Sequence, residues 1–238
     1  MWLALDTATD RASVALGTGA DDVVEEEVEG ARRHAASLVP MVSRLLERRG
    51  VSLDAVTGLA LADGPGSFTG LRVGAAMVKA LARSRGLPLW IAPSLMVRAA
   101  GVASPGSLVL AVADALRGEV YAGLYRFHPG WVETLAAAAV RRPADLVSRS
   151  PVPDVLVGQA PAPVVQGLEA WAGRTMVRPP AGAPHARSLI ALTELAGGAG
   201  RVGAVESWQP EYGRPAEAQT RWETVHGRPL PDPVGTPR

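Results

Sequence analysis

The stretch Val56–Gly86, VTGLALADGPGSFTGLRVGAAMVKALARSRG, joins an apolar segment to a helix of small residues through a glycine-rich loop. Its letters LALA predict a short buried strand, and GPG predicts a turn. Ser67 or Thr69 is placed to cap the helix that follows, and Gly86 is placed to end it. A strand, a glycine loop and a helix in this order indicate an α/β protein.

Two glycines interrupt the predicted helix. Gly70 and Gly74 lie four residues apart, so one helix face has no side chains and can approach a backbone or a ligand closely. Each glycine costs a helix about 1 kcal/mol relative to alanine. The pair therefore indicates a packing or a binding role.

The glycine loop is also a candidate anion site, because backbone N–H groups and a helix N-terminus both favour a phosphate. It lacks the lysine of a P-loop, and Pro65 removes one donor, so a structural turn explains the pattern equally well. The opening DTAT could reach a nucleotide-bound magnesium through water, although aspartate is also common in turns. The candidate phosphate-binding residues are Asp6, Thr7, Gly64, Gly66, Ser67, Thr69 and Gly70.

The composition excludes several classes of protein. The 238 residues carry a formal net charge of +1, with acids and bases interspersed, so the concentrated basic stripe of a non-specific nucleic-acid binder is missing. Without cysteine, disulfides and thiolate zinc sites are excluded. The N-terminal residues do not resemble a signal peptide, and no run approaches the ~20 apolar residues of a spanning helix. We expect a soluble cytoplasmic protein without membrane contact.

The reactive side chains form no pattern of a catalytic site. The histidines do not occur at a metal-ligand spacing such as HExxH. There is also no GxSxG sequence to indicate an activated nucleophile. We therefore expect no metal and no catalytic residue. The four histidines of the chain are His34, His128, His185 and His226.

One pattern occurs in both halves of the chain. LALDTATDRASVAL and LVLAVADALRGEVYAGL each read as an apolar strand, a terminal aspartate (Asp6 and Asp114), a short polar loop and a returning strand. The repeat predicts two similar lobes. We place the N-terminal lobe in residues 1–102, the C-terminal lobe in 103–226 and a disordered tail in 227–238.

The segment 31–50, ARRHAASLVPMVSRLLERRG, predicts an amphipathic helix. Pro40 lies inside the pattern, so the helix is either kinked there or begins just before it. The apolar stripe is broad enough for two neighbours, although such stripes usually face a core. Its residues are Leu38, Met41, Val42 and Leu45.

Five sequences taken in order, LALDTATDRASVAL, HAASLVPMVSRLL, GPGSFTGLRVG, DALRGEVY and PEYGRP, resemble the bacterial TsaB (YeaZ) family. The resemblance covers most of residues 1–127 and returns near 210–216. It implies an actin-like (ASKHA, ribonuclease H-like) fold of two lobes, in agreement with the repeat. It also implies a role in making N6-threonylcarbamoyladenosine at position 37 of tRNAs that decode ANN codons. In that role the family is the partner of the catalytic paralogue TsaD, and the ATPase TsaE completes the assembly.

The sequence departs from the catalytic paralogue at one place. TsaD carries a metal-binding HxxxH after the strand that follows its glycine loop, whereas the matching region here is IAPSLMVRAA. Resemblance and missing ligands together imply a subunit that is not itself an enzyme. The family pairs with TsaD through N-lobe helices, and the same surface suits a homodimer when TsaD is absent. The candidate interface residues are His34, Leu38, Met41, Val42, Leu45, Leu71, Gly74 and Met77.

The resemblance also sets expectations for ligands. We expect tRNA to bind only through the complex and no cofactor to be bound firmly, with ATP or ADP left open at the complex interface. A different function, an independent ATPase or kinase of the actin-like superfamily, is suggested by Asp6, Asp114 and the glycine loop, and tight binding of ATP-Mg would favour it. A peptidase fits poorly without a metal site or an activated nucleophile.

Overall fold

The computed structural model describes residues 1–30, 33–213, 222 and 225–227. The predicted disordered tail, 227–238, lies outside these residues except for Gly227. The last two residues of the PEYGRP sequence also lie outside them.

The first sheet is centred on the N-terminal strand. Among the described residues its strand order is β10-β5-β4-β1-β2-β3. β1 (Trp2–Asp6), β2 (Arg11–Gly19) and β3 (Asp22–Glu29) are antiparallel, whereas β4 (Gly58–Ala62) and β5 (Leu89–Ala92) continue the sheet in parallel on the other side of β1. The predicted LALA strand is β4, and it is buried along its whole length. Such burial is typical of a continuous apolar run in a parallel sheet.

The second sheet repeats this plan. Its order, within the part of the chain that the structure describes, is β8-β7-β6-β9. β6 (Leu108–Asp114) and β7 (Val120–His128) form a hairpin like that of β1 and β2, and β8 (Trp131–Arg141) extends it. β9 (Val155–Gln159) lies parallel to β6, as β4 lies parallel to β1. Each first strand ends on an aspartate, so the repeat inferred from the sequence corresponds to two similarly built sheets.

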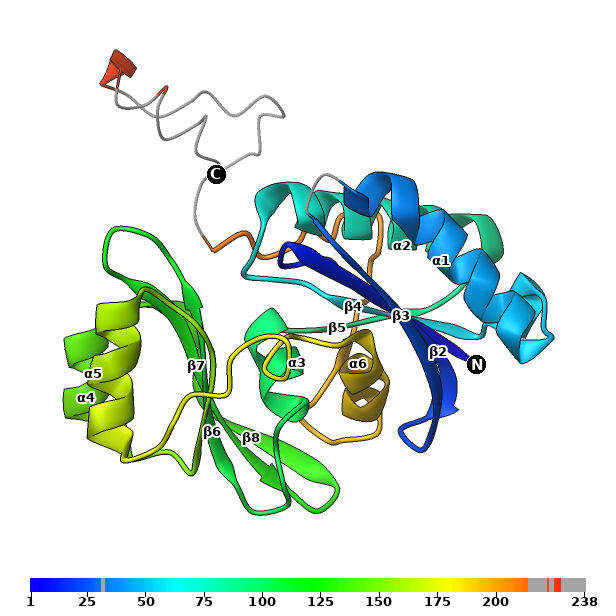
Figure 1. The fold of residues 1–238 in the computed structure, drawn as a ribbon. Coiled ribbons are helices and arrows are strands. Elements are labelled where there is room, and N and C mark those ends of the chain that lie inside the picture. Colours follow the sequence, from blue (N-terminus) through cyan, green and yellow to red (C-terminus); the bar gives the residue numbers. More distant parts are fainter. Residues whose placement is uncertain (31–32, 214–221, 223–224, 228–238) are drawn as a thin grey trace.

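The helices separate and cover the two sheets (Figure 1). α1 and α2 pack on the outer face of the first sheet, and α4 and α5 cover the outer face of the second. α3 and α6 lie between the sheets. The helices are α1 (His34–Arg49), α2 (Phe68–Arg85), α3 (Ser94–Ala100), α4 (Pro143–Arg149), α5 (Ala162–Ala172) and α6 (Ala186–Thr193), with a 3₁₀ turn at Leu53–Ala55.

The ends of α2 follow the sequence signals. The hydroxyl of Ser67 accepts the N–H of Gly70 at 3.3 Å, which confirms Ser67 as the cap. Gly86 ends the helix in the left-handed conformation, with φ of 65°. In α1, the helix begins before Pro40 by almost two turns and continues through it.

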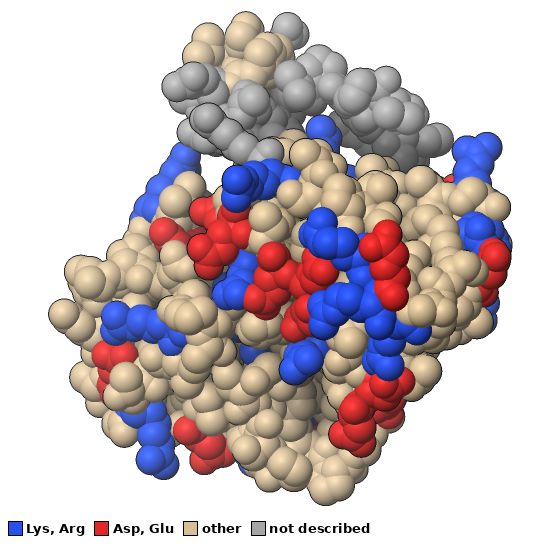
Figure 2. All heavy atoms as spheres, turned by 45° about the vertical axis from the view of Figure 1, so that its right-hand side comes forward, with Lys and Arg blue, Asp and Glu red and all other residues tan. Residues whose placement is uncertain are grey.

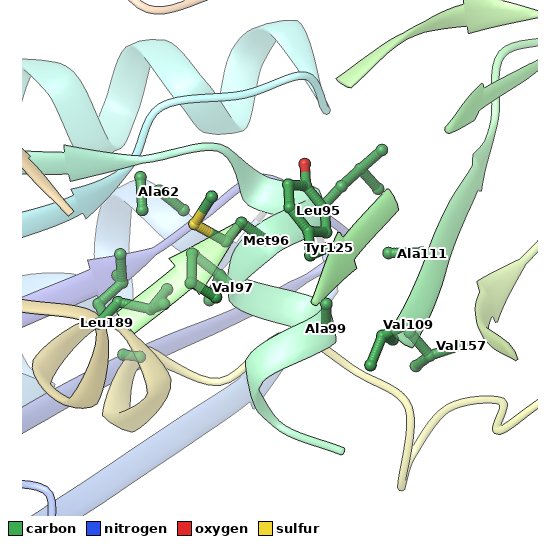
Figure 3. Close-up of a cluster of buried hydrophobic side chains, with 14 of the residues drawn as sticks. Ala62, Leu95, Met96, Val97, Ala99, Val109, Ala111, Tyr125, Val157 and Leu189 are labelled. Carbon is green, nitrogen blue, oxygen red and sulfur yellow. The ribbon is translucent and has the colours of Figure 1, made fainter. Parts of the chain in front are cut away.

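Small and apolar side chains fill the centre of the space between the sheets (Figure 3). Leu95, Met96 and Val97 of α3 are at most 3% exposed and lie between the two lobes. Alanines on the facing strands, such as Ala62 and Ala111, leave room for them. The segment IAPSLMVRAA, in which the sequence lacks a histidine pair, therefore forms part of the packed core.

The C-terminal part of the chain returns to the first lobe. β10 (Gly200–Arg201) pairs with β5, and the N–H of Ala186 in α6 donates to the hydroxyl of Ser13 in β2 at 2.8 Å. These contacts place α6 and β10 with the first lobe, which differs from the assignment of residues 103–226 to the second. The sequence could not show this, because such short elements are fixed by tertiary contacts rather than by a local pattern.

The surface carries charges of both signs. Figure 2 shows acidic and basic side chains intermixed on the face in view, in agreement with the small net charge. Among the described residues, no helix combines the length and the apolar character that crossing a lipid bilayer requires.

Candidate functional site

Asp6 and Thr7 lie at the carboxyl end of β1, and both are buried, with 1% and 0% of their surfaces exposed. Oδ1 of Asp6 accepts the N–H of Ala8 at 3.0 Å. Its Oδ2 and the hydroxyl of Thr7 have no hydrogen-bond partner among the described residues. Burial raises the pKa of Asp6 to about 6, against the opposing effects of the Ala8 N–H and the Arg98 guanidinium. The side chains of these two candidate phosphate-binding residues are thus enclosed by protein.

Three backbone donors of the glycine loop are already bonded within the protein. The N–H of Gly64 donates to the hydroxyl of Ser94 at 3.0 Å, and that of Ser67 donates to the carbonyl of Ala8 at 2.7 Å. The N–H of Gly70 is taken by the Ser67 cap. A phosphate at these positions would have to displace bonds already made. Of the remaining candidates, Thr69 is exposed and Gly66 is half-buried.

The glycines of the loop and of α2 have a packing role. A Cβ at Gly66 would overlap the carbonyl oxygen of Ala8, and one at Gly70 would overlap that of Thr7. A Cβ at Gly74 would overlap the hydroxyl of Thr7. The side-chain-free face of α2 therefore lies against the β1–β2 connection, as the helix spacing of the glycines suggested.

The stripe predicted to meet a partner is part of the core. Leu38, Met41, Val42 and Leu45 are at most 7% exposed and pack against the first sheet. His34 is 1% exposed and lies 3.2 Å from the carbonyl oxygen of Asp10. Their burial in the chain itself leaves these side chains unable to contact another protein, which corrects the interface expectation for them. Leu71 and Gly74 on α2 are likewise buried, whereas Met77 is half-buried.

The outer faces of α1 and α2 form a different surface, which we call the outer helical face. On α1, Arg44 and Arg48 reach Glu26 of β3, so their charges lie toward that edge. Most of the residues between the two helix axes are small or apolar, although Glu47 and Arg72 are exposed as well, and Val39 is 62% exposed. Exposed members of the outer helical face are Ala35, Ala36, Val39 and Pro40 on α1 and Ala76 and Ala80 on α2, with Val73 and Met77 half-buried beside them.

A cavity of about 490 Å³ opens between the two lobes. The β1–β2 hairpin and the end of β3 contribute Arg11 and Glu29 to its lining, the second lobe contributes Gln159, and the chain before α6 contributes Pro184. Arg98 of α3 lines it as well and is only 4% exposed. The sequence interpretation missed Arg98, although an arginine inside the apolar helix SLMVRAA was a signal.

A cluster of Glu25, Glu27 and His185 brings three ligand-type atoms within 4.8 Å of one another. Nδ1 of His185 lies 2.6 Å from Glu27 and 3.5 Å from Glu25, and the neighbouring carboxylate of Glu25 is the main cause of its raised pKa. Arg11 pairs with Glu27, and Arg187 pairs with Glu25. Both carboxylates are therefore already neutralised. The search for histidine pairs missed this cluster because its glutamates are far away in the sequence.

Two sheets of equivalent topology with helices between them define an actin-like (ASKHA) α/β protein. EutJ from Carboxydothermus hydrogenoformans shares the fold with a TM-score of 0.50 at 10% identity, over 80% of this chain and 88% of that one. The family model of TsaD, tRNA N6-adenosine threonylcarbamoyltransferase, matches residues 25–165. YeaZ from Pseudomonas aeruginosa superposes with a TM-score of 0.68 at 30% identity, over 89% of this chain and 98% of that one. The chain belongs to the TsaB/YeaZ family, as its sequence resemblance indicated.

Curated relatives carry the name tRNA threonylcarbamoyladenosine biosynthesis protein TsaB. The protein from Escherichia coli is 40% identical over 127 residues, which are 52% of this chain and 54% of that one. The protein from Bacillus subtilis is 33% identical over 132 residues, 55% and 57% of the two chains. The match thus spans about half the length of these curated relatives.

Proposed function

We propose that this protein is a non-catalytic subunit of the machinery that makes N6-threonylcarbamoyladenosine at position 37 of tRNA, and that it supports the catalytic subunit TsaD by binding it. Membership of the TsaB/YeaZ family carries the proposal, because relatives are named for the biosynthesis of this nucleoside. TsaE joins the two in a larger complex, and tRNA meets the protein through that complex.

The region that matches the metal site of TsaD supports the non-catalytic role. In this chain Leu95, Met96 and Val97 occupy α3 and are buried between the lobes. These side chains contribute packing, and none of them is a metal ligand. Catalysis of the transfer is therefore assigned to TsaD.

The outer helical face is the surface we assign to TsaD. Its exposed alanines allow a partner helix to approach closely, and Val39 offers apolar area to bury. Because the chain itself matches the family model of TsaD, the two proteins share a fold, and equivalent helices can pair about a pseudo-two-fold axis. The same geometry allows a homodimer when TsaD is absent.

Co-purification of the full chain with TsaD tests the surface. Val39→Glu should weaken the complex about tenfold or more, because a carboxylate would be buried without a partner. Val147→Glu on α4 is the matched control, since Val147 is also an exposed helical valine at 40%. Equal binding by both variants would contradict the assignment of the outer helical face.

Reconstitution tests the function itself. TsaD, TsaE and tRNA should give full modification only when this protein is added, and the isolated protein should give none. Complete modification without it would refute the subunit role, whatever the outcome of the binding experiment. Calorimetry with ATP-Mg on the isolated protein separates this role from an independent ATPase or kinase, which would bind and hydrolyse the nucleotide.

A further inference from the structure

Arg98 presents a buried positive charge to the cavity between the lobes. Its side chain is 4% exposed, and Nη1 donates to the carbonyl oxygen of Gly182 at 3.2 Å. A guanidinium has five N–H donors, so this bond satisfies only one of them. Within the described residues Arg98 forms no ion pair. None of its side-chain nitrogens is both fully buried and without a hydrogen-bond partner. Arg98 lines the cavity, so its remaining donors are within reach of a ligand there.

The buried carboxylate of Asp6 does not satisfy this charge. The positive charge of Arg98 opposes the burial that raises the pKa of Asp6, but Oδ2 of Asp6 has no hydrogen-bond partner in the described part of the chain. The two groups thus interact across a distance without a direct bond. Burying a cation is costly unless an anion or several acceptors compensate it. The cavity leaves room for such an anion.

The rest of the lining limits which anion fits. Asp10 and Glu29 line the cavity and are exposed, whereas the charge of Arg11, which also lines it, is paired with Glu27, so the mouth carries unpaired negative charge that repels a polyanion. Pro179, Pro180 and Pro184 form an apolar wall. A volume of about 490 Å³ suits a small molecule.

We propose that this cavity binds a small ligand through a single carboxylate or phosphate group, and that Arg98 holds this group. The planar guanidinium matches both anions with paired hydrogen bonds. The site is independent of the outer helical face, which lies on the opposite side of the first sheet (Figure 1). A variant that abolishes anion binding in the cavity therefore still allows binding of TsaD by the outer helical face to be measured, and the reverse also holds.

Titration of the isotopically labelled full chain, followed by amide chemical shifts, tests the proposal with three probes: sodium acetate, inorganic phosphate and ATP. Acetate or phosphate should give saturable shifts at cavity residues such as Thr9, Gly30 and Ala183, and the probe that does so identifies the ligand chemistry. Arg98→Gln should weaken this binding about tenfold or more. Saturable shifts from neither small anion would overturn the site.

A second variant keeps the test decisive if Arg98→Gln does not fold. Glu29→Gln removes an exposed negative charge at the mouth and should tighten binding of the same anion about two- to threefold at low salt. Unchanged binding in both variants would show that the anion lies elsewhere. Tighter binding of ATP than of either small anion would also refute the proposal, because it would require a site for a polyanion.

Discussion

Substitution of Gly70 by alanine tests the packing role of the glycines in α2. Alanine has the higher helix propensity by about 1 kcal/mol, so propensity alone predicts a more stable protein. At Gly70, however, a Cβ would overlap the carbonyl oxygen of Thr7, well inside the 3.0 Å that real Cβ contacts respect. The obstacle is backbone, so α2 and the β1–β2 connection must separate by about 1 Å, and strain of this kind costs ~1–3 kcal/mol or more. We expect a net loss of up to ~2 kcal/mol.

Gly167 in the middle of α5 is the matched control. A Cβ there meets nothing within 4 Å, so Gly167→Ala should stabilise the protein by the full propensity difference of about 1 kcal/mol. Thermal denaturation monitored by circular dichroism should show opposite shifts, each of about 2–4 °C per kcal/mol for a chain of this size. A higher melting temperature for Gly70→Ala, similar to that of Gly167→Ala, would refute the view that α2 rests directly on the backbone of Thr7.

Three further predictions concern buried and titrating side chains. Leu45→Glu should unfold the protein rather than only break a complex, because Leu45 is 0% exposed, and a folded monomer by circular dichroism would contradict this. Burial raises the folded-state pKa of Asp6 to about 6 from 3.8, so the free energy of unfolding should fall as pH rises from about 4 to 6. The variant Asp6→Asn cannot ionise, so it should remove up to ~3 kcal/mol of this fall, as measured by urea titrations at several pH values. His185 has a raised pKa in the folded state, so its stabilising effect is complete below about pH 6.5 and is lost above that pH. His185→Gln should therefore destabilise the protein at pH 6 more than at pH 9, and an equal effect at both would argue against the pairing with Glu25 and Glu27.

Local signals were sufficient for much of the fold. The β4 strand, the Ser67 cap and the Gly86 stop all depend on neighbouring residues, so the sequence predicted them directly. The duplicated hairpin could also be recognised, because each copy is continuous in the chain. The return of α6 and β10 to the first lobe depends on contacts across more than 100 residues, such as the bond from Ala186 to Ser13, and no local pattern encodes it.

The interface expectation shows a limit of apolar periodicity. A stripe such as Leu38, Met41 and Leu45 indicates that one helix face is buried, but it does not say whether the neighbour is the same chain or another. In the structure the whole stripe packs against the first sheet. The exposed residues of the outer helical face are mainly alanines, which hydrophobic patterns do not single out. Small exposed residues on two neighbouring helices were the signal that the sequence did contain.

The glycine loop can carry a family signature without binding a phosphate. It connects three parts of the chain: Ser67 donates to Ala8 after β1, Gly64 exchanges hydrogen bonds with Ser94 at the start of α3, and Glu211 donates to the carbonyl of Asp63. Each contact brings backbone against backbone, so a side chain in place of Gly64 or Gly66 would collide with Glu211 or Ala8. The same loop thus fixes the position of α3 between the lobes and, with it, Arg98 at the cavity. Changes in the loop should therefore affect the interlobe cavity and the outer helical face together, because α2 begins where the loop ends.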